Sequence, residues 1–248
     1  DRSKTWGNIN YKGSPWVVNV SKAYTPTKGL QNSHLSVCAS HGRYYNNSKN
    51  KWEWQRPYIY CTTEDLLTQT IVVPFLIPML QNAGAVVYSP RERDWQCNEI
   101  IVDNDSPTYN GLYEEKNVGT LWEKSALPGF ANPKKIYVDN ENPFVMGTTR
   151  NVRATNNRAN VTEAAWIPNV TEAGNYAVYV SYQSNPDAVS SAQYTVYHCG
   201  VATKYYVNQK IGGSTWVYLG TFYFSKGQSR ENCVVLTNYS NEKGTVSA

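Results

Sequence analysis

The sequence from Leu35 to Gly42 reads Leu-Ser-Val-Cys-Ala-Ser-His-Gly, an apolar strand that ends in a histidine and a glycine. A loop rich in aromatic residues follows, and Thr62-Thr-Glu-Asp65 then opens a long apolar helix. That helix leads into a second predicted strand, Ala85-Val-Val-Tyr88. A strand, a helix and another strand in this order predict a βαβ unit, the building block of α/β sheets.

Two potential metal ligands lie at one edge of this unit. His41 leaves the end of the first strand and Glu64 begins the helix, at the edge where open α/β sheets place their sites. Histidine and glutamate both serve as zinc ligands, but a catalytic site needs three protein ligands and a position for water. His34 lies about 20 Å away along an extended strand, and His198 falls in a predicted strand. His41 and Glu64 therefore fill only two of the four positions around a catalytic zinc ion.

Simpler interpretations of these two residues stay open. A His-Gly pair after a strand also forms an ordinary turn, and Glu64 also stabilises a helix N-terminus through the helix dipole. The helix itself has Thr62 as predicted N-cap, and its apolar residues cover more than one face, which predicts burial on most sides. Pro74 and Pro78 should kink it or divide it.

The loop between His41 and Glu64 is the best candidate for contact with a substrate. Its aromatic residues suit stacking on sugar rings, and its arginines suit pairing with carboxylates. An alternative is that the tryptophans pack beneath the long connection that follows the unit. The residues assigned to substrate binding are Arg43, Tyr44, Tyr45, Trp52, Trp54 and Arg56.

The composition excludes some classes of protein. Among the 248 residues, 17% are charged and 13% aromatic, with 20 Tyr and 8 Trp, which is typical of half-buried sheets or of sugar-stacking surfaces. The net charge is +4 without a long basic run, so we expect no nucleic-acid partner. No apolar stretch approaches the length of about 20 residues that a membrane span needs.

The second half of the chain has a different pattern. Residues 95–133 show no lasting periodicity and predict a long connection with a short helix near Leu121. From Ile136 onward, short runs with alternating Tyr and Val are separated by turn residues, which predicts an antiparallel β-sandwich. The predicted fold class is therefore a partial α/β segment followed by an all-β antiparallel sandwich, with the boundary near 134.

The first segment resembles a known family. Ala39-Ser-His-Gly42, the helix start at Glu64 and Asn82-Ala-Gly-Ala-Val-Val-Tyr88 resemble the N-terminal half of zinc-dependent N-acetylmuramoyl-L-alanine amidases. They are closer still to amidase-related proteins of Bacteroides-type gut bacteria, often labelled xanthan lyase. The resemblance implies that His41 and Glu64 are zinc ligands. The separation between the two is longer here than in the family, because Tyr44 to Pro57 is inserted.

The second segment, 135–248, resembles the golvesin C-terminal-like domain, on stretches such as Gly174-Asn-Tyr-Ala-Val-Tyr-Val180 and Gly244-Thr-Val-Ser-Ala248. In the Bacteroides-type proteins this sandwich interrupts the amidase-like fold. The resemblance thus implies two domains, an amidase-like α/β segment at 1–134 and a golvesin-like sandwich at 135–248. It also implies that the third zinc ligand and the catalytic Glu belong to the remainder of the hydrolase domain, beyond Ala248. This chain then has no catalytic residue of its own, and its zinc is absent or weakly bound.

Three hypotheses of function follow. The first is a zinc-dependent amidase-like hydrolase of the cell envelope, secreted, periplasmic or at the cell surface, which acts on peptidoglycan and is present here as an inactive fragment. The second is a noncatalytic protein that binds peptidoglycan or another polysaccharide through the sandwich and the aromatic loop. The third is a polysaccharide lyase of the xanthan type.

Overall fold

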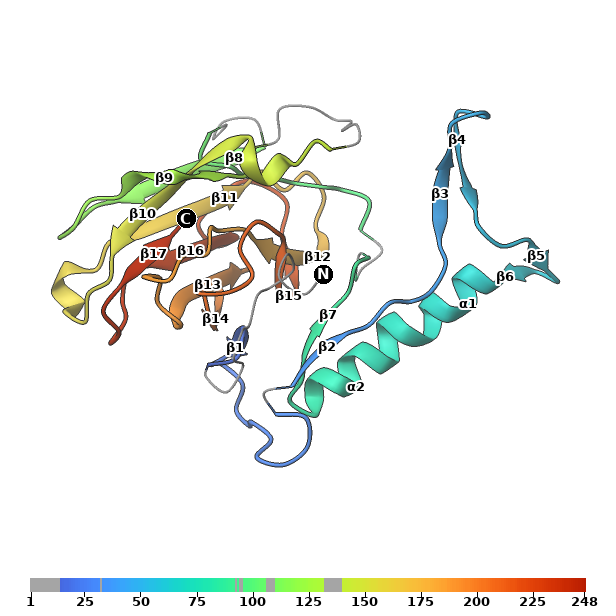
Figure 1. Ribbon diagram of the computed structural model, residues 1–248, viewed down its shortest axis with the longest axis horizontal. Helices are drawn as coiled ribbons and strands as arrows, with labels where there is room; N and C mark the ends of the chain where they lie inside the picture. The colour runs from blue at the N-terminus through green and yellow to red at the C-terminus, as the bar shows by residue number, and fades with distance from the viewer. Residues whose placement is uncertain (1–13, 32, 92, 94–95, 106–109, 132–139) are drawn as a thin grey trace. The chain divides into compact units, whose positions relative to one another are not determined.

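The protein is described by a computed structural model that covers residues 14–31, 33–91, 93, 96–105, 110–131 and 140–248. The chain divides into two compact units (Figure 1). The larger unit consists of Asp1–Ala23 and Gln96–Ala248, and the smaller unit of Tyr24–Trp95. Most of the regular structure is antiparallel β-sheet, which agrees with the sandwich predicted for the second half.

Two sheets form most of the larger unit. The six-stranded sheet has the order β1-β14-β13-β16-β11-β8 and the three-stranded sheet the order β17-β10-β9, and all their pairings are antiparallel. The strands of the first sheet are β1 Val17–Asn19, β8 Gly111–Lys116, β11 Glu163–Pro168, β13 Ala192–His198, β14 Val201–Val207 and β16 Cys233–Thr237. Those of the second are β9 Glu123–Gly129, β10 Gly147–Arg153 and β17 Thr245–Ser247.

The remaining elements of this unit are a strand pair and short helices. Strands β12 (Gly174–Val180) and β15 (Val217–Phe224) form an antiparallel pair with a bulge after Val178. Single 3₁₀ turns lie at Pro143–Val145 (η2) and Arg158–Asn160 (η3). Burial alternates only in part along the strands: in β13, Ala192, Tyr194 and Val196 are fully buried, and Thr195 between them is buried as well.

Buried hydrogen bonds tie the two sheets of the larger unit together. The fully buried Gln209 donates from Nε2 to the hydroxyl of Tyr194 in β13 (3.1 Å) and to the carbonyl of Ser247 in β17 (2.7 Å). Its Oε1 accepts from the Ser247 backbone N–H (2.8 Å). One side chain thus satisfies polar groups of both sheets inside the apolar core, where an unpaired polar group is costly.

The N-terminal segment is held by a second buried contact. Trp16 donates from Nε1 to the Tyr182 hydroxyl (2.6 Å), which in turn donates to the carbonyl of Ile211 (2.7 Å). Gly212 lies against this indole with φ +72°, and a Cβ there would fall 1.9 Å from the Trp16 ring. The position therefore needs glycine for both its backbone conformation and its close approach. Strand β1, which follows Trp16, pairs with β14.

The expectation of a long connection with a helix near Leu121 is wrong. Residues within 95–133 form strands β8 and β9, and Leu121 lies in neither helix nor strand. Both strands are at sheet edges, and charged or proline residues such as Glu115, Lys124 and Pro128 are tolerated at edges. This hides the apolar alternation that marks a central strand. The strand expected at Ile136–Val138 lies outside the described residues.

The smaller unit contains the predicted βαβ arrangement. Strands β2 (His34–Ser36) and β7 (Val86–Tyr88) pair in parallel, and the helical segment lies between them in sequence. Two hairpins precede the helix, with bounds β3 Arg43–Asn46, β4 Lys51–Trp54, β5 Tyr58–Ile59 and β6 Thr62–Thr63. The core of this unit is formed by Ile77, Ala85 and Val87, against which Leu30, Leu35, Val37, Val72 and Leu80 pack.

The helical segment is divided as its prolines predict. Helix α1 spans Glu64–Ile71, a π-helical turn η1 spans Val72–Leu76 and helix α2 spans Ile77–Asn82. Pro74 lies in the π turn, since proline has no N–H for the regular helical hydrogen bond. The N-cap is Thr63, one residue later than expected, and its hydroxyl accepts from the Leu66 N–H (3.3 Å). Among the described residues, no helix has the length and apolar character needed to cross a bilayer.

The expectation that this segment is buried on most sides is wrong. Only Asp65 and Ile77 are buried, because the two-stranded β2–β7 pair covers a single side of the helix. The apolar side chains that are exposed follow each other at helical spacing: Leu67, Ile71, Phe75, Leu76 and Met79.

The Gln209 bridge gives a test of the sandwich. In a Gln209→Leu variant, the Ser247 backbone groups and the Tyr194 hydroxyl lose their partners while they stay buried. We expect the free energy of unfolding to fall by about 3 kcal/mol, measured by urea titration. Gln228→Leu, a matched change at an exposed position, should alter it by less than about 0.5 kcal/mol. Equal unfolding midpoints for wild type and Gln209→Leu would contradict the bridge.

Candidate functional site

The chain between β2 and β3 turns sharply and presents His41. Ser40 has φ +65°, a left-handed conformation that is uncommon for residues other than glycine. The Ser40 carbonyl accepts from Nη2 of Arg91 (3.0 Å), and the same guanidinium covers Gly42, where a Cβ would fall 2.0 Å from it. Arg91 thus fixes the loop between β2 and β3.

The start of helix α1 supplies the second part of the site. Glu64 is the first helical residue, and the neighbouring Asp65 is fully buried. Asp65 accepts the backbone N–H of Arg56 at its Oδ2 (3.0 Å), while its Oδ1 is buried without a hydrogen-bond partner. Because Asp65 holds the backbone of Arg56 beside the helix start, the Arg56 side chain is directed toward Glu64.

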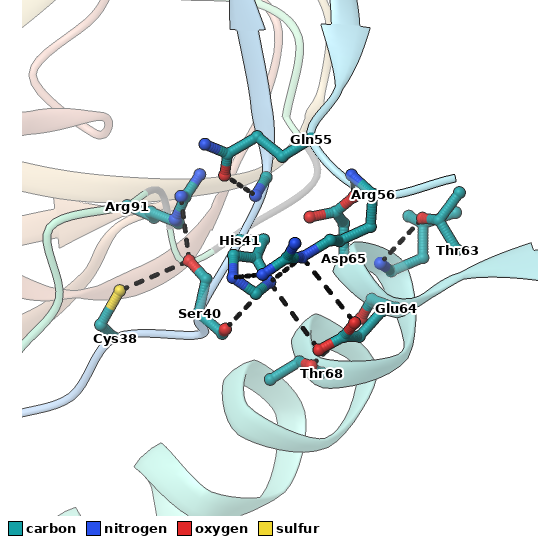
Figure 2. A network of polar contacts seen from close by, with 12 residues as sticks. Cys38, Ser40, His41, Gln55, Arg56, Thr63, Glu64, Asp65, Thr68 and Arg91 are labelled. Atoms are coloured by element: carbon teal, nitrogen blue, oxygen red, sulfur yellow. Dashed lines mark hydrogen bonds and ion pairs between the residues drawn. The ribbon is translucent and has the colours of Figure 1, made fainter. Parts of the chain in front are cut away.

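His41, Arg56 and Glu64 form one cluster of side chains, and Figure 2 shows them together. His41 Nδ1 lies 3.8 Å from Glu64 Oε1. The Arg56 guanidinium contacts both imidazole nitrogens, with Nε 3.2 Å from Nδ1 and Nη2 2.9 Å from Nε2, and its Nε is 3.9 Å from Glu64 Oε2. A neutral imidazole has one unprotonated nitrogen, so it accepts one of these two N–H groups.

The described residues alone do not complete a catalytic zinc site. His41 and Glu64 are close enough to share a metal ion, but no group of three or more His, Cys, Asp or Glu residues gathers anywhere in the described part of the chain. A catalytic zinc needs three protein ligands. In addition, the cationic Arg56 contacts both candidate ligands, on the side where a metal ion would need them.

The hairpin of β3 and β4 has one aromatic face. Its register pairs Arg43 with Trp54 and Tyr45 with Trp52, so these four residues share a side of the hairpin. The Arg43 guanidinium lies 4.5 Å from the centroid of the Trp54 ring, a cation–π contact. Tyr45 and Trp52 meet edge to face with centroids 5.6 Å apart. Tyr45 is 41% exposed and Trp52 63% exposed, so this aromatic face is open to solvent.

The opposite face of the hairpin is ionic. Glu53 accepts from Asn46 (2.8 Å) and Lys49 (3.1 Å) and lies 3.2 Å from the ammonium of Lys51. These contacts, first the Asn46 hydrogen bond and then those of the two lysines, lower the pKa of Glu53 to about 2. The network includes both strands and the turn, and it stabilises a hairpin that would be marginal on its own. Tyr44 belongs to this face, which separates it from the other predicted aromatic contacts.

The structure therefore sorts the predicted site residues into two groups and leaves Tyr44 outside both. Arg56, assigned to substrate binding from the sequence, lies with the candidate metal ligands. Arg43, Tyr45, Trp52 and Trp54 form the aromatic face. Sequence reasoning missed Asp65 as the residue that places Arg56, and the exposed Tyr58, Ile59 and Tyr60 of the next hairpin. The run Pro57-Tyr-Ile-Tyr60 could have indicated this hairpin, because three consecutive large apolar residues follow a proline in the sequence. In the structure all three are exposed.

Comparisons with known proteins give a family match for the second half of the chain. A search of curated proteins finds no match. A solved structure described as Paenibacillus xanthan lyase at 2.6 Å resolution aligns with a TM-score of 0.40 and 21% identity, over 54% of this chain and 11% of its own length. This chain thus spans only a small part of that protein. Residues 143–248, which hold the sandwich strands from β10 to β17, match the Golvesin C-terminal domain family.

Proposed function

We propose that this protein binds an extracellular polysaccharide through the aromatic face of the β3–β4 hairpin. The observation that carries the proposal is that Arg43, Tyr45, Trp52 and Trp54 share one face of the hairpin, with Tyr45 and Trp52 widely exposed. A sugar ring has apolar C–H faces and polar edges. Tyr and Trp suit such a ligand because each combines an apolar ring with a polar tip.

The side chains of this face are held in fixed positions, which favours a binding role over mere exposure of aromatic rings to solvent. Trp54 is held beneath Arg43, and Trp52 is held against Tyr45, so two platforms exist before a ligand arrives. No carboxylate among the described residues pairs with Arg43. Its guanidinium is therefore available for a sugar carboxylate while it stays stacked on the indole. Acidic glycans such as peptidoglycan, which carries stem-peptide carboxylates, fit this combination.

The family match supports the same class of function. Residues 143–248 match the Golvesin C-terminal domain, which favours an extracellular, polysaccharide-associated role. Within that role we propose that the protein acts outside the cytoplasm, secreted, in the periplasm or at the cell surface. The golvesin-like unit and the hairpin unit would then both belong to a protein that works on the cell envelope or on external glycans.

The hairpin gives the test of this proposal. We expect Trp52→Ala and Tyr45→Ala each to weaken binding by roughly tenfold, since an aromatic platform contributes about 1 kcal/mol or more beyond its buried area. Binding is measured by pull-down on purified peptidoglycan sacculi and by mobility in gels that contain xanthan. Tyr24→Ala is the matched control, because Tyr24 is 74% exposed in the same unit but outside the hairpin.

The proposal fails if neither polymer retains the wild-type protein. It also fails if Tyr24→Ala reduces retention as much as Tyr45→Ala, because the effect would then not depend on the aromatic face. Circular dichroism of each variant shows whether the fold is kept.

A second candidate is a zinc-dependent hydrolase of the amidase type, and one observation favours it. His41 and Glu64, which the sequence resemblance assigns as zinc ligands, lie 3.8 Å apart. The missing ligand and the catalytic acid–base would have to come from outside the described residues. In this proposal Arg56 holds the two ligands together by charge and hydrogen bonding until a metal site is completed.

This candidate makes a prediction about Arg56. A guanidinium about 5 Å from a divalent ion opposes it by roughly 1–2 kcal/mol in a water-like medium. We therefore expect Arg56→Gln to raise the zinc affinity of this chain by on the order of tenfold, measured by competition with a chromogenic chelator.

Two variants control this experiment. Arg43→Gln removes a nearby arginine of the hairpin without touching the cluster and should leave the zinc affinity unchanged. Addition of His41→Ala to Arg56→Gln should abolish the gain. A gain that survives without His41, or no gain at all, would contradict a metal role for this pair.

A further inference from the structure

The larger unit contains a shallow polar pocket of about 460 Å³ that is widely open to solvent. It belongs to a different unit from the hairpin and stands independently of the proposed function. The residues that line the pocket are Asn104, Asp105, Tyr113, Glu115, Lys124, Thr148 and Arg150.

One wall of the pocket joins the two sheets. Arg150 of β10 donates to both carboxylate oxygens of Glu115 in the edge strand β8, from Nε (2.6 Å) and from Nη2 (2.9 Å). The same Nη2 donates to the Trp122 carbonyl (3.0 Å), and the Tyr113 hydroxyl donates to Glu115 (2.8 Å). Burial, together with Glu115, raises the pKa of Tyr113, so its hydroxyl stays protonated. This wall is fixed before a ligand arrives.

A second group of lining residues is fixed as well. Asp105 accepts the backbone N–H of Thr148 (2.5 Å) at one oxygen and the Thr148 hydroxyl (2.6 Å) at the other. Asn104 donates from Nδ2 to the same hydroxyl (3.0 Å), which leaves its Oδ1 without a bond in the described network. Planar polar groups are thus held in set positions around the pocket, as a specific polar ligand requires.

The spare hydrogen-bonding capacity indicates the kind of ligand. On the donor side, Nη1 of Arg150 and the ammonium of Lys124, its cross-strand neighbour, have no acceptor among the described residues. On the acceptor side, a carboxylate offers about four lone-pair sites, and Asp105 uses two of them. The lining therefore offers both donors and acceptors to a bound molecule.

The charges of the lining balance, with the carboxylates of Asp105 and Glu115 against the cations of Lys124 and Arg150. An anionic ligand would be attracted by Lys124 and repelled by Asp105. A sugar hydroxyl both donates and accepts, and it carries no charge. We infer that this pocket binds a neutral sugar ring, as a saccharide subsite separate from the hairpin.

Nuclear magnetic resonance titration of the full chain tests the inference. The probes are cellotetraose, mannotetraose and xylotetraose as neutral saccharides and tetragalacturonate as an acidic one. We expect at least one neutral probe to give saturable shifts of the Asn104 side-chain amide and of the Arg150 Nε–H. Lys124→Met, which removes an exposed donor and keeps the apolar stem, should weaken this binding at least fivefold. Lys116→Met, on the exposed end of β8, should leave it unchanged.

Three outcomes with the wild-type chain or with Lys124→Met would overturn the inference. These are no shift of the two signals with any neutral probe, an unchanged affinity in Lys124→Met, and tighter binding of tetragalacturonate than of every neutral probe. Titration of Trp52→Ala separates the two sites. The pocket signals should shift in this variant as in wild type, whether or not the hairpin binds glycan. Their loss in Trp52→Ala would also count against a separate subsite.

Discussion

Alternation of side chains along the β3–β4 hairpin is the constraint on which the candidate binding surface depends. Neighbouring residues of a strand point to opposite faces, so the register separates Arg43, Tyr45, Trp52 and Trp54 from the ionic residues around Glu53. A slip by one residue would mix the two sets. The ionic network on one face therefore supports the aromatic platforms on the other, although it does not touch them.

The cluster at the start of helix α1 also depends on the position of a charged side chain. Arg56 lies against His41 and Glu64 and is placed by the buried Asp65. A cation between a histidine and a carboxylate keeps both side chains in place without a metal ion. Arg56 lies between the hairpin and the helix, so the same stretch of chain separates His41 from Glu64 in sequence and supplies the cation between them.

Much of the fold was predictable because it depends on local pattern. Alternating Tyr and Val predicted the sandwich strands, the strand–helix–strand order predicted the parallel β2–β7 pair, and Pro74 predicted the break in the helix. The edge strands β8 and β9 were missed because edges tolerate charged residues. The exposure of the helical segment was not predicted, because the sequence of a helix does not show how many strands cover it. The proximity of His41 and Glu64 was predictable, but the place of Arg56 depends on tertiary contacts with Asp65.

The proposed binding mode is a sugar ring stacked on the aromatic face of the hairpin. Its most direct test is the search for intermolecular nuclear Overhauser effects between the ring protons of Trp52 and the C–H protons of a bound muropeptide or xanthan-derived oligosaccharide. Such contacts are expected at Trp52 and Tyr45, and none is expected at Tyr24. Saturable binding without any contact to these two rings would contradict it.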